Sequence, residues 1–416
     1  MAHFAVICPE SPGHFNPMTT LIAALKTEGH QVSWIGTLDG TARAKRLNID
    51  SIAVGQSEYP IGSLDSILEQ LGQLSGWRAA RFSLNAYLSA MKVLQRDCPQ
   101  AIRDSGATAL ITDETVFASR NLADVVGLPW ISVSNALCLH PDADHPPLLP
   151  AWKYRKTRVA RIRNSLGRSF GGLMMRSMRK QIFDFRRQHN LPAYDFFHQN
   201  VSERATIVQC PSEFDYPRSN PPAWLHYVGA LHQTSSRPSV DFSYERLDGR
   251  PLIYASLGTA QNRLYSLFQT IAAAADDPSY QLVISLGGGG TPEDLGPLPG
   301  NPIVVPFAPQ LELIRRASLV ITHAGMNTAM ESIAQGKPMV AIPITNDQPA
   351  VAARIAWTGC GEVVPIRQVN RQRLTRAIHR VLEEERYRQN SLRLSAANRR
   401  AGGVSVATKK IARSLS

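Results

Sequence analysis

The sequence has few cysteines, and none of them form a recognisable pair. Its 416 residues include five, which lie far apart at Cys8, Cys98, Cys138, Cys210 and Cys360. There is no C-x-x-C motif and the number is odd, so we expect neither a disulfide framework nor a zinc knuckle. A reducing, cytoplasmic environment is the expectation.

Long apolar runs are also missing. No stretch approaches the roughly 18 residues that a transmembrane helix needs. The first residues, MAHFAVICPESPGH, have no basic segment and only a short apolar one, so no secretory signal is expected. With 44% hydrophobic and 19% charged residues, the composition is that of a folded globular protein. The length favours two domains.

Excess positive charge is nearly absent outside one segment. The chain carries a net charge of +12. Residues 151–187 hold twelve Lys and Arg against one acid, Asp184, and so account for almost all of it. No recognised nucleic-acid-binding module surrounds this basic insert, and no nucleic-acid partner is expected.

Apolar residues recur at helical spacing within the basic insert, which predicts helices. They are Ile162, Leu166, Phe170, Leu173, Met174, Met178, Ile182 and Phe185. Glycines 167, 171 and 172 interrupt the pattern and favour two helices over one. Two interpretations stay open: peripheral contact with an anionic membrane, or a helical pair packed on its own domain with a solvated basic face.

The first half of the chain alternates short apolar strands with helices. Strands are predicted at 3–9, 31–36, 108–112 and 130–134, with a helix over 119–127. Asn16 and Pro17 predict the start of another helix, which ends at Gly29. Strands that are apolar on both faces indicate a parallel sheet covered by helices on both sides.

A polar stretch rich in Ser and Pro, residues 232–250, predicts an interdomain linker. Strands then return at 252–258, 281–287, 302–307, 318–323 and 338–343. We therefore predict an α/β protein with two doubly wound, Rossmann-like domains, 1–231 and 251–416, facing across a cleft. The chain reads as helical from about Asn370 onward, and these helices are candidates to return to the first domain.

Ligands of such folds bind beyond the carboxyl ends of the strands, and two polar residues occupy such positions in the first half. His14, in SPGHFNP, follows the first strand and is a candidate general base. Asp113 comes immediately after the predicted strand 108–112, and would fix the tautomer of a neighbouring imidazole. The alternatives are helix capping by either residue.

The segment 304–350 carries the densest set of candidates. The strand SLVITH leads through a glycine turn into a helix whose N-terminus is suited to an anion. His323, Asn327 and Thr328 would add donors to a phosphate. Further candidates are Glu331 for a ribose, Phe307 and Gln310 for a base, and Asp347 and Gln348 for sugar hydroxyls.

This segment resembles the donor-binding signature of the family-1 UDP-glycosyltransferases, which have the GT-B fold. The similarity lies in FAPQ and THAGMNTAMESIAQGKPMVAIPITNDQ, and extends to GHFNP, ITDETVF and YASLGT. The chain is also similar in size and pattern to bacterial carotenoid (zeaxanthin) and macrolide glucosyltransferases. Two positions depart from plant members: Phe307 replaces a tryptophan, and Met326 replaces an aromatic residue.

The resemblance implies a role for each matching residue. His14 would be the base and Asp113 its partner. The donor-binding residues would be Ser256, Thr259, Phe307, Ala308, Gln310, His323, Gly325, Asn327, Thr328, Glu331, Asp347 and Gln348.

The expected function is inverting, metal-independent transfer of a sugar, most simply glucose from UDP-glucose, to a lipophilic hydroxylated acceptor such as a carotenoid, sterol-like lipid or polyketide. The UDP-sugar is a co-substrate, no cofactor is expected, and a monomer is expected. Residues 56–104, 135–150 and the basic insert are predicted to line the acceptor pocket. The competing classes are a GT-B nucleotide-sugar epimerase and a non-catalytic module that binds nucleotide sugars or membranes.

Two other motifs are set aside. The glycine-rich segment 285–296 lacks the G-x-G-x-x-G spacing, so NAD binding is not expected. The Asp-x-Asp at 142–144 lies in a proline-rich loop, where solvated turn acids are expected instead of a metal site.

Overall fold

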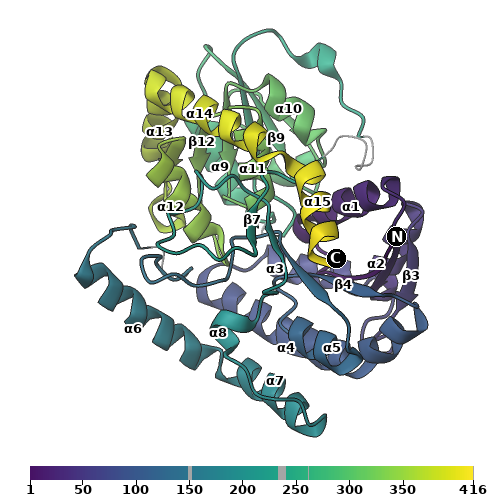
Figure 1. The fold of residues 1–416 in the computed structure, drawn as a ribbon. Coiled ribbons are helices and arrows are strands. Elements are labelled where there is room, and N and C mark those ends of the chain that lie inside the picture. The colour runs from purple at the N-terminus through teal and green to yellow at the C-terminus, as the bar shows by residue number, and fades with distance from the viewer. Residues whose placement is uncertain (149–151, 233–239, 261, 416) are drawn as a thin grey trace.

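The computed structural model describes residues 1–148, 152–232, 240–260 and 262–415. The chain forms two lobes, each built on a parallel sheet covered by helices (Figure 1). No helix among the described residues is long and apolar enough to span a membrane.

The first lobe contains a sheet in the order β3-β2-β1-β4-β5-β6-β7. Its strands are β1 (His3–Ile7), β2 (Gln31–Gly36), β3 (Asp50–Ala53), β4 (Ala109–Asp113), β5 (Trp130–Ser134), β6 (Thr206–Val208) and β7 (Leu225–Tyr227). Its helices are α1 (Pro12–Thr27), α2 (Leu38–Arg46), α3 (Ser63–Gly72), α4 (Gly76–Asp104), α5 (Ser119–Val126), α6 (Arg158–Met174), α7 (Arg176–Gln188) and α8 (Phe196–Gln199).

The second lobe contains a sheet in the order β10-β9-β8-β11-β12-β13. Its strands are β8 (Leu252–Ser256), β9 (Gln281–Ser285), β10 (Ile303–Val305), β11 (Leu319–Thr322), β12 (Met339–Ala341) and β13 (Gly361–Val363). The helices after β8 are α9 (Tyr265–Ala274), α10 (Gln310–Arg316), α11 (Met326–Ala334), α12 (Gln348–Thr358), α13 (Arg371–Glu383), α14 (Glu385–Ala401) and α15 (Gly403–Leu415).

Strand β1 shows why both faces of the first sheet are buried. Phe4 and Val6 belong to the apolar cluster on one face, and Ala5 and Ile7 belong to the cluster on the other. Successive side chains of a strand point to opposite faces, so an uninterrupted apolar run needs helices on both sides. The fold agrees with the doubly wound α/β architecture expected from the sequence.

The start of the first helix differs from the prediction. Helix α1 begins at Pro12 after the N-cap Ser11, and Pro17 lies inside it. The prediction of a start at Asn16 and Pro17 is wrong, because Pro12 already supplies the fixed φ that favours the first helical position. Pro17 has no N–H to bond the carbonyl of Gly13 four residues earlier. That carbonyl instead accepts a hydrogen bond from Asn327 Nδ2 of the second lobe, at 2.9 Å.

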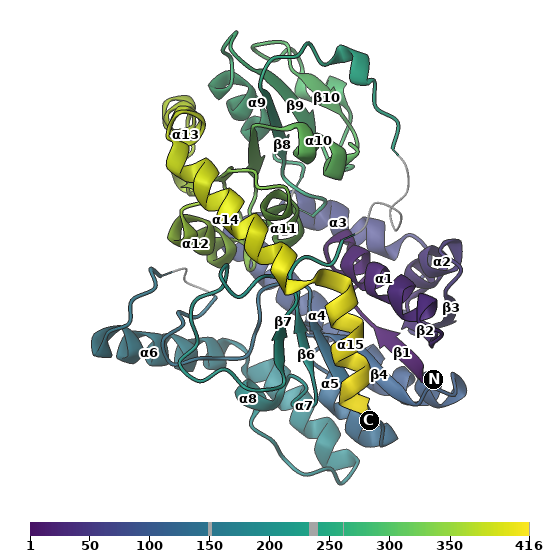
Figure 2. The ribbon, with the colours of Figure 1, turned by 45° about the horizontal axis from the view of Figure 1, so that its top comes forward.

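The two lobes are connected at two places. The predicted linker, 232–250, lies between them, although its residues 233–239 fall outside the described residues. Helix α15 returns from the second lobe and packs along α1 (Figure 2). Its Val404, Ala407 and Ile411 join the apolar cluster that contains Phe4 and Val6 of β1.

The basic insert forms two helices, α6 and α7, which meet at Met175 instead of at the glycines. Helix α7 buries Met178, Ile182 and Phe185 in its own lobe. Both views place α6 at the edge of the first lobe.

Candidate active site

A cleft of about 1630 Å³ lies between the lobes and is lined by both. In each sheet the strand order reverses at its centre, between β1 and β4 in the first and between β8 and β11 in the second. The residues that follow these four strands line the cleft. This is the position at which ligands bind in doubly wound folds.

His14 and Asp113 are brought together at the first of these reversals. His14 lies in the first turn of α1, and Asp113 is the last residue of β4, which pairs with β1. His14 Nδ1 and Asp113 Oδ2 are 2.8 Å apart, and the carboxylate is fully buried while 18% of the His14 side chain is exposed. With Nδ1 held by the carboxylate, Nε2 is the nitrogen that can accept a proton.

Other bonds fix the carboxylate of Asp113. Its Oδ2 also accepts from Asn135 Nδ2 at 2.7 Å, and its Oδ1 accepts from the Thr115 amide at 2.8 Å and from the Thr115 hydroxyl. Asp113 therefore does not cap α5, which begins six residues later at Ser119. Four hydrogen bonds leave the carboxylate one orientation, with an oxygen toward the imidazole.

The pair shifts both of its pKa values. Burial lowers the pKa of His14, but Asp113 and then Asp347 raise it above the ordinary value. Burial raises the pKa of Asp113, but the His14 imidazole and the Thr115 bonds bring it below its ordinary value. Each partner thus favours the charged form of the other.

His323 and Gly325 form the turn at the second reversal, between β11 and α11, of which Gly325 is the N-cap. The imidazole of His323 is buried between two glycines. A Cβ at Gly258, which has a φ of +74°, would lie 2.5 Å from His323 Cε1, and one at Gly325 would also collide with the ring. Burial lowers the pKa of His323 to about 4, so this imidazole is neutral at pH 7 and can donate one hydrogen bond.

Gln310 and Glu331 face each other beside this turn. Gln310 Nε2 donates to Glu331 Oε2 at 2.7 Å and approaches Thr328 Oγ1 at 3.4 Å, while its Oε1 accepts from the Tyr254 hydroxyl at 3.0 Å. Tyr254 of β8 therefore fixes the orientation of the Gln310 side chain, and Gln310 in turn holds Glu331. Thr328 and Glu331 are both buried in α11.

Phe307 and Ala308 also line the cleft. The ring of Phe307 is 54% exposed. Its Cζ approaches Gly288 so closely that a Cβ there would lie 2.5 Å away. An exposed ring held on a glycine turn offers a face for stacking.

Asn327 joins the two lobes instead of standing free in the cleft. Its Nδ2 donates to the Gly13 carbonyl, and its Oδ1 accepts from Gln209 Nε2 at 3.0 Å. Ser256 and Thr259 also line the cleft, and the Ser256 hydroxyl accepts from the Gly258 amide at 3.2 Å.

Asp347 and Gln348 begin α12 and both line the cleft. Burial raises the pKa of Asp347, and the proximity of His14 opposes this. Gln348 Oε1 accepts from the amides of Ile344 and Thr345, at 2.8 and 3.0 Å. The oxygen of Gln348 thus holds the preceding loop.

The rest of the cleft is an apolar chamber in the first lobe. It is lined by Tyr59, Leu64, Ile67, Leu68, Phe82, Tyr87, Met91, Leu94 and Phe117. This agrees with the expected contribution of 56–104. The expected lining by the basic insert and by residues beyond Ala136 is wrong for the described residues, because α7 is turned into its own lobe and α6 lies at the edge of that lobe.

The Asp-x-Asp segment also differs from expectation. Asp144 is not solvated but fully buried, bound by Arg161 at 2.6 Å and by the Ser219 hydroxyl at 2.6 Å. Asp142 accepts from the amides of Asp144 and Ser219. These acids anchor α6, and the described residues contain no cluster of three His, Cys, Asp or Glu placed for a metal ion.

Sequence reasoning missed several residues of the site. Asn135 follows β5 directly, so the rule that selected Asp113 could have selected it too. Tyr254 lies inside the apolar strand β8, and Gln209 follows β6, a strand of only three residues. Neither position has a local sequence pattern that would indicate a functional residue.

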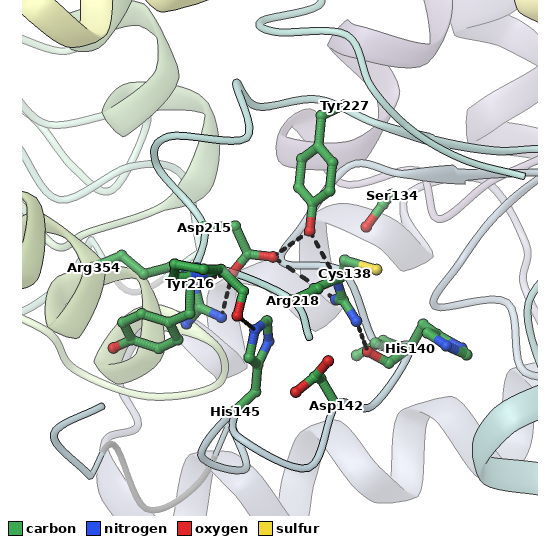
Figure 3. A network of polar contacts seen from close by, with 12 residues as sticks. Ser134, Cys138, His140, Asp142, His145, Asp215, Tyr216, Arg218, Tyr227 and Arg354 are labelled. Carbon is green, nitrogen blue, oxygen red and sulfur yellow. Dashed lines mark hydrogen bonds and ion pairs between the residues drawn. The ribbon is translucent and has the colours of Figure 1, made fainter. Parts of the chain in front are cut away.

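A buried network joins the lobes next to the cleft (Figure 3). Arg354 of α12 donates through Nε to Asp215 Oδ1 of the first lobe at 2.7 Å. The other oxygen of Asp215 accepts from the Tyr227 hydroxyl at 2.6 Å, and Arg218 donates to Tyr227 at 2.9 Å. Burial raises the pKa of Asp215, but Arg354 and its other cationic neighbours bring it below the ordinary value.

Comparisons with known proteins agree with this geometry. The model of the family described as UDP-glucoronosyl and UDP-glucosyl transferase matches residues 94–400. The zeaxanthin glucosyltransferase of Pantoea ananas is 31% identical over 409 residues, which cover 98% of this chain and 94% of that protein. The 4'-demethylrebeccamycin synthase of Lentzea aerocolonigenes is 25% identical over 94% of both chains.

The fold is also found among solved structures. The calicheamicin glycosyltransferase CalG4 superposes with a TM-score of 0.74 at 19% identity, covering 100% of this chain and 98% of that one. These matches confirm the family resemblance and the GT-B fold expected from the sequence. The chain belongs to the UDP-glucoronosyl and UDP-glucosyl transferase family and is a glycosyltransferase.

Proposed function

We propose that the protein transfers glucose from UDP-glucose to a hydroxyl of a lipophilic small molecule, with inversion at the anomeric carbon and without a metal ion. The observation that carries this proposal is the His14–Asp113 pair, which lies in the same cleft as the N-terminus of α11 on the opposite lobe. An acceptor from one lobe and a donor on the other would meet between them.

The proposed reaction begins with the acceptor hydroxyl. His14 Nε2 takes its proton as the oxygen attacks the anomeric carbon, and the bond between that carbon and the diphosphate oxygen breaks. Asp113 stabilises the imidazolium that forms. Attack from the face opposite the leaving group converts an α-linked donor into a β-glycoside.

The second lobe would hold the donor. The amides at the start of α11, His323 and the hydroxyls of Ser256 or Thr259 would stabilise charge on the departing diphosphate. Phe307 would stack on the base, with Ala308 beside it. Gln310 and Glu331 would bind the ribose. Asp347 and Gln348 would bind the transferred sugar. Gly325 leaves room for His323, and Thr328 adds a hydroxyl.

Asn327 has a more specific part in this proposal. Its amide holds the Gly13 carbonyl in this structure. The second hydrogen of that amide would donate to a diphosphate oxygen while the first still holds the carbonyl.

The apolar lining of the first lobe favours a lipophilic acceptor. We propose a carotenoid alcohol as the acceptor, since the similarity to the zeaxanthin glucosyltransferase of Pantoea ananas extends over 98% of this chain. We further propose a monomer in a reducing compartment, because one chain supplies both halves of the cleft and all five cysteines are free.

The test is incubation with a panel of nucleotide sugars and hydroxylated lipids, polyketides and carotenoids, with glycosides detected by mass spectrometry and anomeric configuration by NMR. We expect a β-glucoside from UDP-glucose, with undiminished yield in EDTA. His14→Ala should abolish product while UDP still binds. Equal product from His14→Ala, or conversion of the UDP-sugar without acceptor, would overturn the assignment.

A further inference from the structure

Helix α6 turns its apolar face away from the protein. Val159, Ile162, Leu166, Phe170 and Leu173 are 63–76% exposed. On a helix with 3.6 residues per turn, these five positions fall within an arc of about 80°. They therefore form one continuous apolar stripe along the outer side of α6, here called the α6 stripe.

The opposite side of α6 attaches it to the lobe through small and polar residues. Asn164 donates to the Asp144 carbonyl at 3.0 Å, and Arg161 binds the Asp144 carboxylate. Gly167 lies against Trp152, and Gly172 lies against Phe197. This is the reverse of an ordinary surface helix, whose apolar side faces the core. Exposure of the α6 stripe is thus imposed by specific contacts on the other side.

Positive charge surrounds the α6 stripe. Arg158 flanks it on one side, and Lys153, Arg155, Lys156 and Arg176 are exposed at the two ends of the helix. On the other side the guanidinium of Arg163 is held by the Asn164 side chain and the Lys153 carbonyl. The described part of the insert has one acid, Asp184, which is paired with Lys180 and Arg187. An apolar stripe bordered by cations complements a bilayer surface whose headgroups are anionic and whose acyl chains begin just below.

A line of aromatic rings connects the attached side of α6, opposite the α6 stripe, to the cleft. Phe197, which touches Gly172, contacts Phe196, whose ring is stacked on Phe117 at 6.4 Å. Phe117 in turn contacts Tyr87, and both line the apolar chamber. Helix α6 and the acceptor side of the cleft are therefore linked by side-chain contacts within the first lobe.

We propose that the α6 stripe docks this protein on anionic lipid bilayers. Helix α6 lies in the plane of the interface, its five apolar side chains enter the acyl boundary, and the flanking cations bind lipid phosphates. This docking goes beyond glycosyl transfer and does not depend on the proposed donor or acceptor.

The test is flotation of the full-length protein with vesicles of phosphatidylcholine alone or with phosphatidylglycerol added. We expect binding to the anionic vesicles that weakens as salt is raised. The triple variant Ile162→Ser, Leu166→Ser, Phe170→Ser should lower the bound fraction about tenfold or more. Leu392→Ser, which changes a 49% exposed leucine on α14, is the matched control and should bind like the parent.

Further measurements distinguish docking from other occupants of the α6 stripe. Phe170→Trp should show a blue-shifted emission that brominated lipids quench. Thermal unfolding and UDP binding should be unchanged in the triple variant, since the three side chains are 63–67% exposed and none lines the cleft among the described residues. Equal flotation of the triple variant, or a dimer in sedimentation that dissociates in the triple variant without any vesicle binding, would overturn the proposal.

Discussion

At the scale of single residues, the two imidazoles of the cleft, His14 and His323, have pKa values that are shifted in opposite directions. His14 faces two carboxylates, Asp113 and Asp347, and its pKa is raised. No carboxylate among the described residues shifts the pKa of His323, which burial lowers to about 4. The same side chain is thus prepared as a proton acceptor in one lobe and as a neutral donor in the other.

The raised pKa of His14 predicts the acid limb of the pH–rate profile. A base must be neutral to act, so kcat/KM should fall as pH drops through a value above 6.5, the ordinary value for histidine. Asp113→Asn removes the largest raising influence. We expect the limb to move to lower pH and the maximal rate to fall by about 100-fold or more.

The control for this profile is Asp347→Asn, since Asp347 raises the pKa of His14 less than Asp113 does. It should move the limb in the same direction by a smaller amount. A limb that stays in place in Asp113→Asn would contradict the assignment of His14 as the titrating base.

The glycine beneath His323 gives a second prediction at this scale. Gly258→Ala places a Cβ against His323 Cε1 in a backbone conformation with positive φ. We expect the imidazole to be displaced and UDP affinity, measured by calorimetry, to fall about tenfold or more. Gly296→Ala has a similar φ of +64° but open space around the new Cβ, so it should cost stability without changing UDP affinity.

At the scale of elements, helix α15 follows the second lobe in the chain but completes the core of the first lobe. Ala407 and Ile411 are fully buried in the cluster shared with α1. The Thr408 hydroxyl donates to Glu28 Oε1 at 2.6 Å. The stability of the first lobe therefore depends on residues of α15 that lie about 380 positions after their contacts in α1 and the turn that follows it, as Thr408 does after Glu28.

Truncation of Ile411 should show this dependence. Ile411→Ala leaves a cavity between α15 and α1, and we expect a loss of about 2–5 kcal/mol in the free energy of unfolding. Leu392 of α14, which is half-exposed, provides the control. Leu392→Ala should change the free energy of unfolding by less than about 1 kcal/mol. Urea denaturation followed by circular dichroism would measure both. Equal losses would show that α15 is not part of this core.

At the scale of the whole molecule, the lobes are joined by apolar packing and by the buried pair of Asp215 and Arg354. One apolar cluster contains Val208, Cys210 and Phe214 of the first lobe together with Ala350 and Val351 of α12. The ion pair lies beside it, with both side chains at most 5% exposed. Since Asp347 and Gln348 begin the same helix, this contact also positions the proposed sugar site.

Breaking the pair should remove the nearer of the two cations at the buried Asp215 and leave only Arg218, 3.8 Å from Oδ2, beside it. Arg354→Met is expected to destabilise the protein by about 3–5 kcal/mol and to raise KM for the nucleotide sugar. Adding Asp215→Asn to it should recover part of the lost stability. Chemical denaturation of the four members of this cycle would measure the coupling, and additive losses would show that the pair does not connect the lobes energetically.

Much of this molecule was accessible from the sequence because its signals are local. Apolar strands such as 31–36 and 318–323 predicted a parallel sheet in each half of the chain, although β3, β6, β7 and β13 were not among the predicted strands. Polar residues in the segments that follow strands predicted the positions of His14, Asp113 and His323. The pairing of β1 with β4 then brings His14 and Asp113 together.

Other features depend on contacts that no local pattern encodes. The outward face of α6 follows from the attachment of its other side to Asp144, and a helical pattern alone does not say which side is buried. The start of α1 was misplaced because two prolines, Pro12 and Pro17, both suit a helix N-terminus. The engagement of Asn327 by Gly13 required the relative placement of the lobes.

The two connections between the lobes also lie next to each other. The Gly403 amide donates to the Val228 carbonyl at 2.6 Å, and the Ala230 amide donates to Asn398 Oδ1 at 2.8 Å. Gly229, Gly402 and Gly403 all have positive φ there, which glycine adopts without strain. The chain thus begins its departure from the first lobe beside the point at which it returns to it, so that a side chain placed at any of these three glycines would strain both segments at once.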